Sequence, residues 1–89
     1  PRASVMEPAQ GAPLRLVTRA DCHLCEQLQD ELEALRGHYP LPAVELADVD
    51  ADPQLLQRYG FKVPVLLLND VPVCHFRLDR AELLRLLRL

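Results

Sequence analysis

Thr18-Arg19-Ala20-Asp21-Cys22-His23-Leu24-Cys25 is the stretch at which the pattern of the chain changes, and it decides the fold. Before it, residues 14–18 alternate apolar and polar side chains, which is typical of a β-strand. After it, apolar residues recur with helical spacing, and charged residues fall on the opposite side. The apolar stripe of this expected helix consists of Leu24, Leu28, Leu32 and Leu35. The sequence therefore predicts a strand that leads directly into an amphipathic helix, with a Cys-x-x-Cys motif at the junction.

The position of the two cysteines favours redox chemistry. At a helix N-terminus, unpaired backbone N–H groups and the positive end of the helix dipole stabilise a thiolate, the species that attacks disulfides. Two intervening residues place the second sulfur about one helical turn further on. We therefore predict that Cys22 attacks a substrate disulfide and that Cys25 resolves the mixed disulfide. The charge of Asp21 opposes thiolate formation, whereas Arg19 and a protonated His23 favour it.

Other interpretations of the cysteine pair stay open. The two cysteines are compatible with ordinary buried side chains, and with an interaction module in which the pair is catalytically silent. They are also compatible with a metal or iron–sulfur carrier that recruits an external thiol or a second chain. A structural metal site typically needs four ligands, often as two such pairs, and no second pair is present, so we assign no metal ligand. The side chains available to complete such a site are His23, His38, Cys74 and His75.

Composition limits the class of protein. The chain has 89 residues, of which 49% are hydrophobic but only 4% aromatic, and this suits one small domain. The net charge of -3 and the scarcity of aromatic rings argue against a nucleic-acid partner. The three cysteines are too few for the disulfide framework of a small secreted protein, and their number is odd. Cys74 is expected to be a small core residue.

The sequence also bears on location. No apolar run approaches the roughly 18–20 residues that span a bilayer, so we expect no membrane partner. Residues 1–13 contain no apolar block like that of a signal peptide, and we interpret them as a flexible leader to a domain over residues 14–89. These features predict a cytoplasmic protein. In a reducing compartment, an isolated Cys-x-x-Cys pair indicates redox or metal chemistry rather than a structural disulfide.

Signals at helix ends delimit the middle of the chain. Gly37 is expected to end the first helix, and residues 43–49 to form a second strand. Asp52 and Pro53 have the residue types of an N-cap and a first helical position, and Gly60 is expected to end the helix that they begin. The inward-facing residues expected in this second helix are Leu55, Leu56 and Tyr59.

The pattern in the last third of the chain predicts a β-hairpin followed by a helix. Residues 65–68 and 71–77 are predicted strands joined by a turn at Asn69-Asp70, and Pro72 makes the second of them an edge strand. A capping-box pattern over residues 79–82 begins a final helix with Leu83, Leu84, Leu86 and Leu87 facing inward. The order is therefore β-α-β-α-β-β-α. A right-handed crossover makes the first two strands parallel, which predicts an α/β fold with a mixed four-stranded sheet flanked by helices.

Two motifs in this order resemble the thioredoxin-fold superfamily, and most of all a small bacterial glutaredoxin-like family with the tetrapeptide CHLC. One is the run Thr18 to Cys25 after a strand. The other extends from Asp48-Val49-Asp50-Ala51-Asp52-Pro53 to Tyr59-Gly60-Phe61-Lys62-Val63-Pro64-Val65-Leu66. The resemblance implies a cis peptide bond between Val63 and Pro64, facing the cysteine pair. An extended substrate would then pair with the exposed backbone of Val63 as an added strand.

The resemblance implies a monomeric thiol–disulfide oxidoreductase. Its partners would be protein or glutathione mixed disulfides and a thiol reductant system, with glutathione as a co-substrate and no tightly bound cofactor. The chain departs from the familiar pattern at three places. His-Leu separates the cysteines, and Leu16 stands where thioredoxins carry a buried acid. Phe76-Arg77-Leu78-Asp79 stands where glutaredoxins place Gly-Gly and Asp to hold glutathione.

Overall fold

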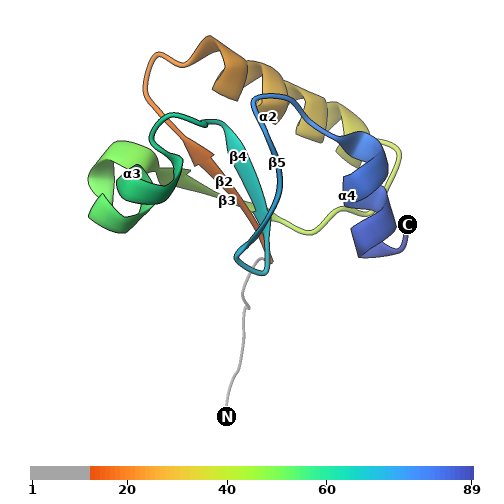
Figure 1. Ribbon diagram of the computed structural model, residues 1–89. Helices are drawn as coiled ribbons and strands as arrows, with labels where there is room; N and C mark the ends of the chain where they lie inside the picture. The colour runs from red at the N-terminus through yellow and green to blue at the C-terminus, as the bar shows by residue number, and fades with distance from the viewer. Residues whose placement is uncertain (1–12) are drawn as a thin grey trace.

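A computed structural model describes residues 13–89 of the chain (Figure 1). The predicted flexible leader therefore lies outside the described residues except for Pro13, whose carbonyl oxygen accepts a hydrogen bond from the Asn69 N–H at 2.8 Å. The elements follow the predicted order: β2 (Leu14–Thr18), α2 (His23–Arg36), β3 (Val44–Asp48), the short 3-10 helix η1 (Val49–Ala51), α3 (Pro53–Tyr59), β4 (Val65–Leu68), β5 (Val71–His75) and α4 (Arg80–Leu87). None of the described helices is both long and apolar enough to cross a membrane.

The four strands form one mixed sheet in the order β3-β2-β4-β5. β2 is parallel to β3 and antiparallel to β4, and β4 is antiparallel to β5. Asn69 and Asp70 both have positive φ, at 51° and 68°, as a tight hairpin turn requires. The proline-bearing strand β5 lies at the edge, where Pro72 costs no central ladder bond. The prediction of a mixed four-stranded α/β sheet is therefore confirmed.

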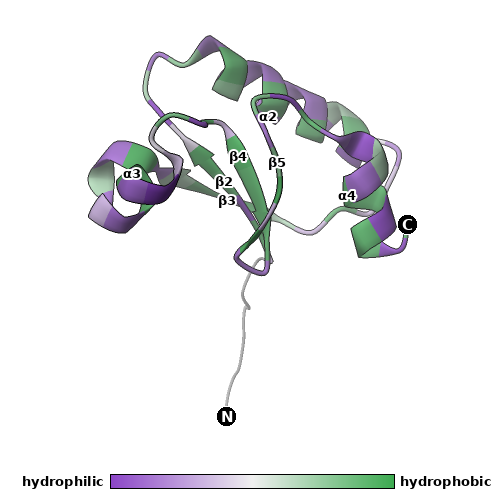
Figure 2. Cartoon of the chain, viewed as in Figure 1, coloured by the Kyte–Doolittle hydropathy of each residue, from purple (hydrophilic) through white to green (hydrophobic). Residues whose placement is uncertain are grey.

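The core lies on both faces of the sheet. Because side chains alternate along a strand, Leu14 and Leu16 pack on one face and Val17 on the other. The first face packs against α2 and α4, and the second lies under α3, so the sheet forms the middle layer. Figure 2 shows the hydrophobic strands between the helices. The buried cluster on the first face is completed by Leu28, Leu32, Leu35, Leu41, Leu66 and Leu83, and that on the second by Val49, Val65 and Leu67.

Three leucines expected to face inward are instead exposed. Leu24, Leu56 and Leu86 are 38%, 43% and 39% exposed. Each has a neighbour in sequence that packs against the core, and successive residues are about 100° apart around a helix, so these three lie toward the edge of the buried face. In α2 the buried stripe begins at Cys25 and continues through Leu28, Leu32 and Leu35.

Two expected strands end earlier than predicted. The strand over residues 43–49 stops at Asp48, because the Asp48 carboxylate accepts a hydrogen bond from the Asp50 N–H at 2.9 Å and caps η1. The strand over residues 71–77 stops at His75, because Phe76 has φ 67° and leaves the extended conformation.

Candidate active site

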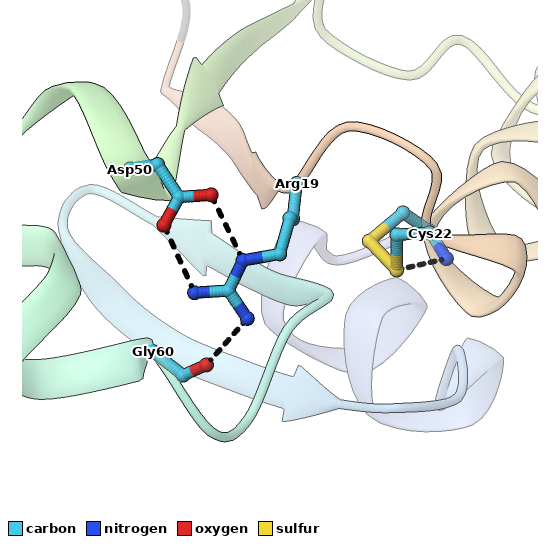
Figure 3. Close-up of a disulfide and its surroundings, with 5 residues drawn as sticks. Arg19, Cys22, Asp50 and Gly60 are labelled. Carbon is cyan, nitrogen blue, oxygen red and sulfur yellow. Dashed lines mark hydrogen bonds and ion pairs between the residues drawn. A yellow bond between two sulfur atoms is a disulfide. The ribbon is translucent and has the colours of Figure 1, made fainter.

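The two cysteines of the CHLC motif form a disulfide at the start of α2, with their Cα atoms 5.2 Å apart (Figure 3). Cys22 is the N-cap of the helix, in an extended conformation, and its Sγ accepts a hydrogen bond from the Cys25 N–H at 3.1 Å. The Cys22 carbonyl oxygen accepts from the Glu26 N–H, which begins the helical ladder. Sulfur therefore takes the place that Ser, Thr, Asp or Asn oxygen takes in most helices.

The two sulfur-bearing residues differ in access. Cys22 is partly exposed, whereas Cys25 is 3% exposed and begins the buried stripe of α2. An incoming disulfide can therefore approach Cys22 but not Cys25. A thiolate on Cys22 would keep the hydrogen bond from the Cys25 N–H and gain from the helix dipole, which stabilises negative charge at that position.

Val63 and Pro64 lie at the same end of the sheet as the cysteine loop. Val65 is opposite Val17 in the β2–β4 register, so Pro64 comes just where β2 ends and the loop to Cys22 begins. The Val63–Pro64 peptide bond is cis. Pro64 is buried, and its carbonyl oxygen accepts a hydrogen bond from the Phe76 N–H at 2.8 Å. Within residues 13–89, neither the N–H nor the C=O of Val63 has a hydrogen-bond partner.

Arg19 joins the cysteine loop to the segment that precedes Val63 (Figure 3). Its Nε and Nη2 donate to the two carboxylate oxygens of Asp50 at 2.9 and 3.1 Å, and its Nη1 donates to the Gly60 carbonyl oxygen at 2.8 Å. The hydrogen bond and the ion pair raise the pKa of Arg19 and lower that of Asp50. The guanidinium is turned toward Asp50 and Gly60 rather than toward the disulfide. From the sequence we expected Arg19 to favour the Cys22 thiolate, whereas in the structure its hydrogen bonds hold the loop before Cys22.

Sequence reasoning did not identify the partners of Arg19. Asp50 lies in a run with Asp48 and Asp52, and nothing in that run distinguishes the acid that would pair with Arg19. From the sequence, Gly60 was expected only to end the second helix. Its buried position adds a spatial reason for glycine, because a Cβ there would lie 2.6 Å from the Leu56 carbonyl oxygen.

The remaining candidate residues lie apart from the disulfide or on the surface. His23 is exposed, with its Nε2 3.3 Å from the side-chain nitrogen of Gln27. Cys74 is half-buried on β5 and packs against the core cluster on the first face of the sheet, where burial raises the pKa of its thiol. In the part of the chain that the structure describes, no group of three or more His, Cys, Asp or Glu side chains is placed to hold a metal ion.

Fold and site together define a thioredoxin-fold protein with a cysteine pair at a helix N-terminus. Residues 13–88 match the family model of the glutaredoxin-like domain (DUF836), and the chain belongs to this family. The fold is similar to that of protein Ne2328 from Nitrosomonas europaea, with a TM-score of 0.71, 28% identity, and coverage of 92% of this chain and 93% of that one.

A second solved structure, thioredoxin 1 from Thermosipho africanus TCF52B, has the same fold with lower structural similarity and lower sequence identity. Its TM-score is 0.53 at 16% identity, with 84% of this chain and 89% of that chain covered. No curated protein matches the chain. The expected thioredoxin-like fold and the expected membership of a glutaredoxin-like family are therefore confirmed.

Proposed function

We propose that this protein is a thiol–disulfide oxidoreductase in which Cys22 attacks and Cys25 resolves. One observation carries the proposal: the accessible Cys22 Sγ caps α2 and accepts the Cys25 N–H, while its disulfide partner is buried. A charge-assisted hydrogen bond of this kind favours the thiolate over the thiol. The glutaredoxin-like family supports the redox character of the pair.

The reaction begins with the reduced pair. The Cys22 thiolate attacks one sulfur of a substrate disulfide, the substrate S–S bond breaks, and the other substrate sulfur leaves as a thiolate. Cys25 then loses its proton to solvent and attacks the Cys22 sulfur of the mixed disulfide. The Cys22–Cys25 disulfide forms, and the second substrate sulfur leaves. The substrate gains two electrons, the protein loses two, and an external thiol reductant restores the dithiol.

Val63 supplies a means of positioning the substrate. Its N–H and C=O, which have no partner within residues 13–89, lie just before β4 and suit pairing with an extended chain, as in other cases of strand addition. The proposed partners are protein or glutathione mixed disulfides and a thiol reductant system. The protein would act as a monomer in the cytoplasm. Glutathione would act as a co-substrate, and the protein would need no tightly bound cofactor.

Reduction of insulin and of a glutathione mixed disulfide tests the proposal. The wild-type protein should reduce both, the variant Cys22→Ser should be inactive, and Cys25→Ser should accumulate a mixed disulfide through Cys22. Cys74→Ser is the matched control and should retain wild-type rates. Equal rates for wild type and Cys22→Ser would exclude the proposed reaction. Stoichiometric metal on the purified protein, lost in Cys25→Ser, would favour the metal carrier instead.

A further inference from the structure

A groove runs between α2 and the connection from β5 to α4. It encloses about 400 Å³, and its apolar lining residues are Leu28, Phe76 and Leu78. Leu28 is almost fully buried, so Phe76 and Leu78 supply the accessible apolar surface. Figure 1 shows this connection passing alongside α2. Phe76 lines the groove from this connection and is 43% exposed, with its ring centroid 4.7 Å from that of His75.

The polar rim of the groove is unevenly charged. Asp30 and Glu31 line it from α2, and Arg77 lines it from the opposite connection. All three side chains are exposed, and within residues 13–89 none of them forms an ion pair. Among the residues that line the groove itself, two carboxylates face one guanidinium, and this excess of one negative charge favours a cationic group. Arg80 lines the adjoining hollow together with Glu31, so Asp30 is the carboxylate farther from a second guanidinium.

The groove adjoins the candidate active site at two points. The Phe76 N–H donates to the carbonyl oxygen of Pro64, and Gln27, another rim residue, lies 3.3 Å from the ring of His23, the neighbour of Cys22. A chain bound at Cys22 can therefore continue into the groove. Glu31 follows Cys22 by nine positions along α2, which is roughly 13 Å at 1.5 Å per residue. An extended chain covers that distance in about four residues.

We propose that this groove binds the chain that flanks the reactive disulfide of a protein substrate, and that it selects an apolar residue followed by a basic one about four residues from the reactive cysteine. This inference rests on the proposed function and names its substrate class. Glutathione fits the rim less well, because its carboxylates outnumber its ammonium group and it would meet Asp30 and Glu31.

Disulfide-linked peptide dimers test the groove. One peptide carries Lys four residues from its cysteine, and a second carries Glu at the same position. Both keep the same leucine between the cysteine and that position. Rates with the reduced full-length protein are divided by rates with dithiothreitol, which corrects for intrinsic reactivity. We expect kcat/KM for the Lys peptide to exceed that for the Glu peptide by about two- to fivefold, the range of exposed ion pairs, and added salt to reduce the difference.

A double variant tests whether Asp30 and Glu31 cause the preference for the Lys peptide. Asp30→Asn with Glu31→Gln should abolish the preference for Lys, whereas Glu33→Gln, on the same helix but outside the groove, should keep it. Equal rates for the two peptides, a preference that survives the double variant, or faster reduction of glutathione disulfide than of the Lys peptide would overturn the inference. If insulin reduction depends on Cys22 while these results fail, only the groove is wrong. If no Cys22-dependent reduction of any disulfide occurs, the proposed function fails too.

Discussion

The guanidinium of Arg19 binds both carboxylate oxygens of Asp50, 31 residues further along the chain, at 2.9 and 3.1 Å. Its remaining nitrogen donates to the Gly60 carbonyl oxygen at 2.8 Å. One side chain therefore ties the loop before Cys22 to η1 and to the turn that leads to Val63. The planar fork of arginine permits this arrangement, which a lysine ammonium would not reproduce.

Substitution Asp50→Asn should loosen the loop before Cys22. Loss of the carboxylate charge weakens the two-point contact, so amide hydrogen exchange at residues 19–22 should become faster than in the wild type. Glu45→Gln is the control, because it breaks the Arg15–Glu45 pair at 3.4 Å and leaves Arg19 intact. Unchanged exchange at residues 19–22 in Asp50→Asn would show that the ion pair does not hold the loop.

The Arg19–Asp50 ion pair should make the stability of the folded protein depend on pH. Arg19 holds the pKa of Asp50 below its ordinary value of 3.8. The contribution of Asp50 is therefore complete above its unfolded pKa and is lost as the pH falls through the lower folded pKa. Between about pH 5 and pH 3, urea midpoints of the wild type should fall more steeply than those of Asp50→Asn. Parallel curves would contradict this expectation.

Gly60→Ala should destabilise the protein. The added Cβ would lie 2.6 Å from the Leu56 carbonyl oxygen, a backbone atom that cannot move without shifting the end of α3. We expect a loss of about 1–3 kcal/mol in the free energy of unfolding, measured by urea denaturation. At Gly37 the corresponding distance to the Ala34 carbonyl oxygen is 3.3 Å, so Gly37→Ala should cost less. The reverse ranking would refute the steric argument.

Two leucines of α4 should respond differently to truncation. Leu83 is fully buried, so Leu83→Ala leaves a cavity and should cost about 2–5 kcal/mol. Leu86 is 39% exposed, and Leu86→Ala should change stability by only about 0.5 kcal/mol. Chemical denaturation of both variants measures the difference. Similar losses would mean that the last helix packs on another face.

Cys74 should react more slowly than Cys22 in the reduced protein. Burial raises the pKa of its thiol, so less thiolate forms at neutral pH. Iodoacetamide at about pH 7, followed by peptide mass mapping, should modify Cys22 before Cys74. In the oxidised protein Cys74 should react slowly compared with an unstructured peptide thiol. Modification at the rate of that peptide would show that the strand does not shield it.

Local patterns predicted most of the fold. β2 and β4 have the predicted bounds, and Asp52 and Asp79 cap their helices through backbone N–H groups at residues 54 and 82. Each signal involves residues only a few positions apart, so the sequence reports it directly. The pattern predicted the inward face of each helix less well, since Leu24 has the residue type of a core position but Cys25 occupies it.

The order of elements, their caps, the hairpin turn and the Cys-x-x-Cys at a helix start were determined by the sequence itself, because local backbone preferences decide them. The tertiary structure decided which sulfur is accessible, which acid Arg19 binds, and where the groove beside α2 lies. These features depend on residues that are distant along the chain and meet only when the sheet assembles with β2 in its interior. The same two cysteines thus acquired different exposures from packing that neither residue encodes alone.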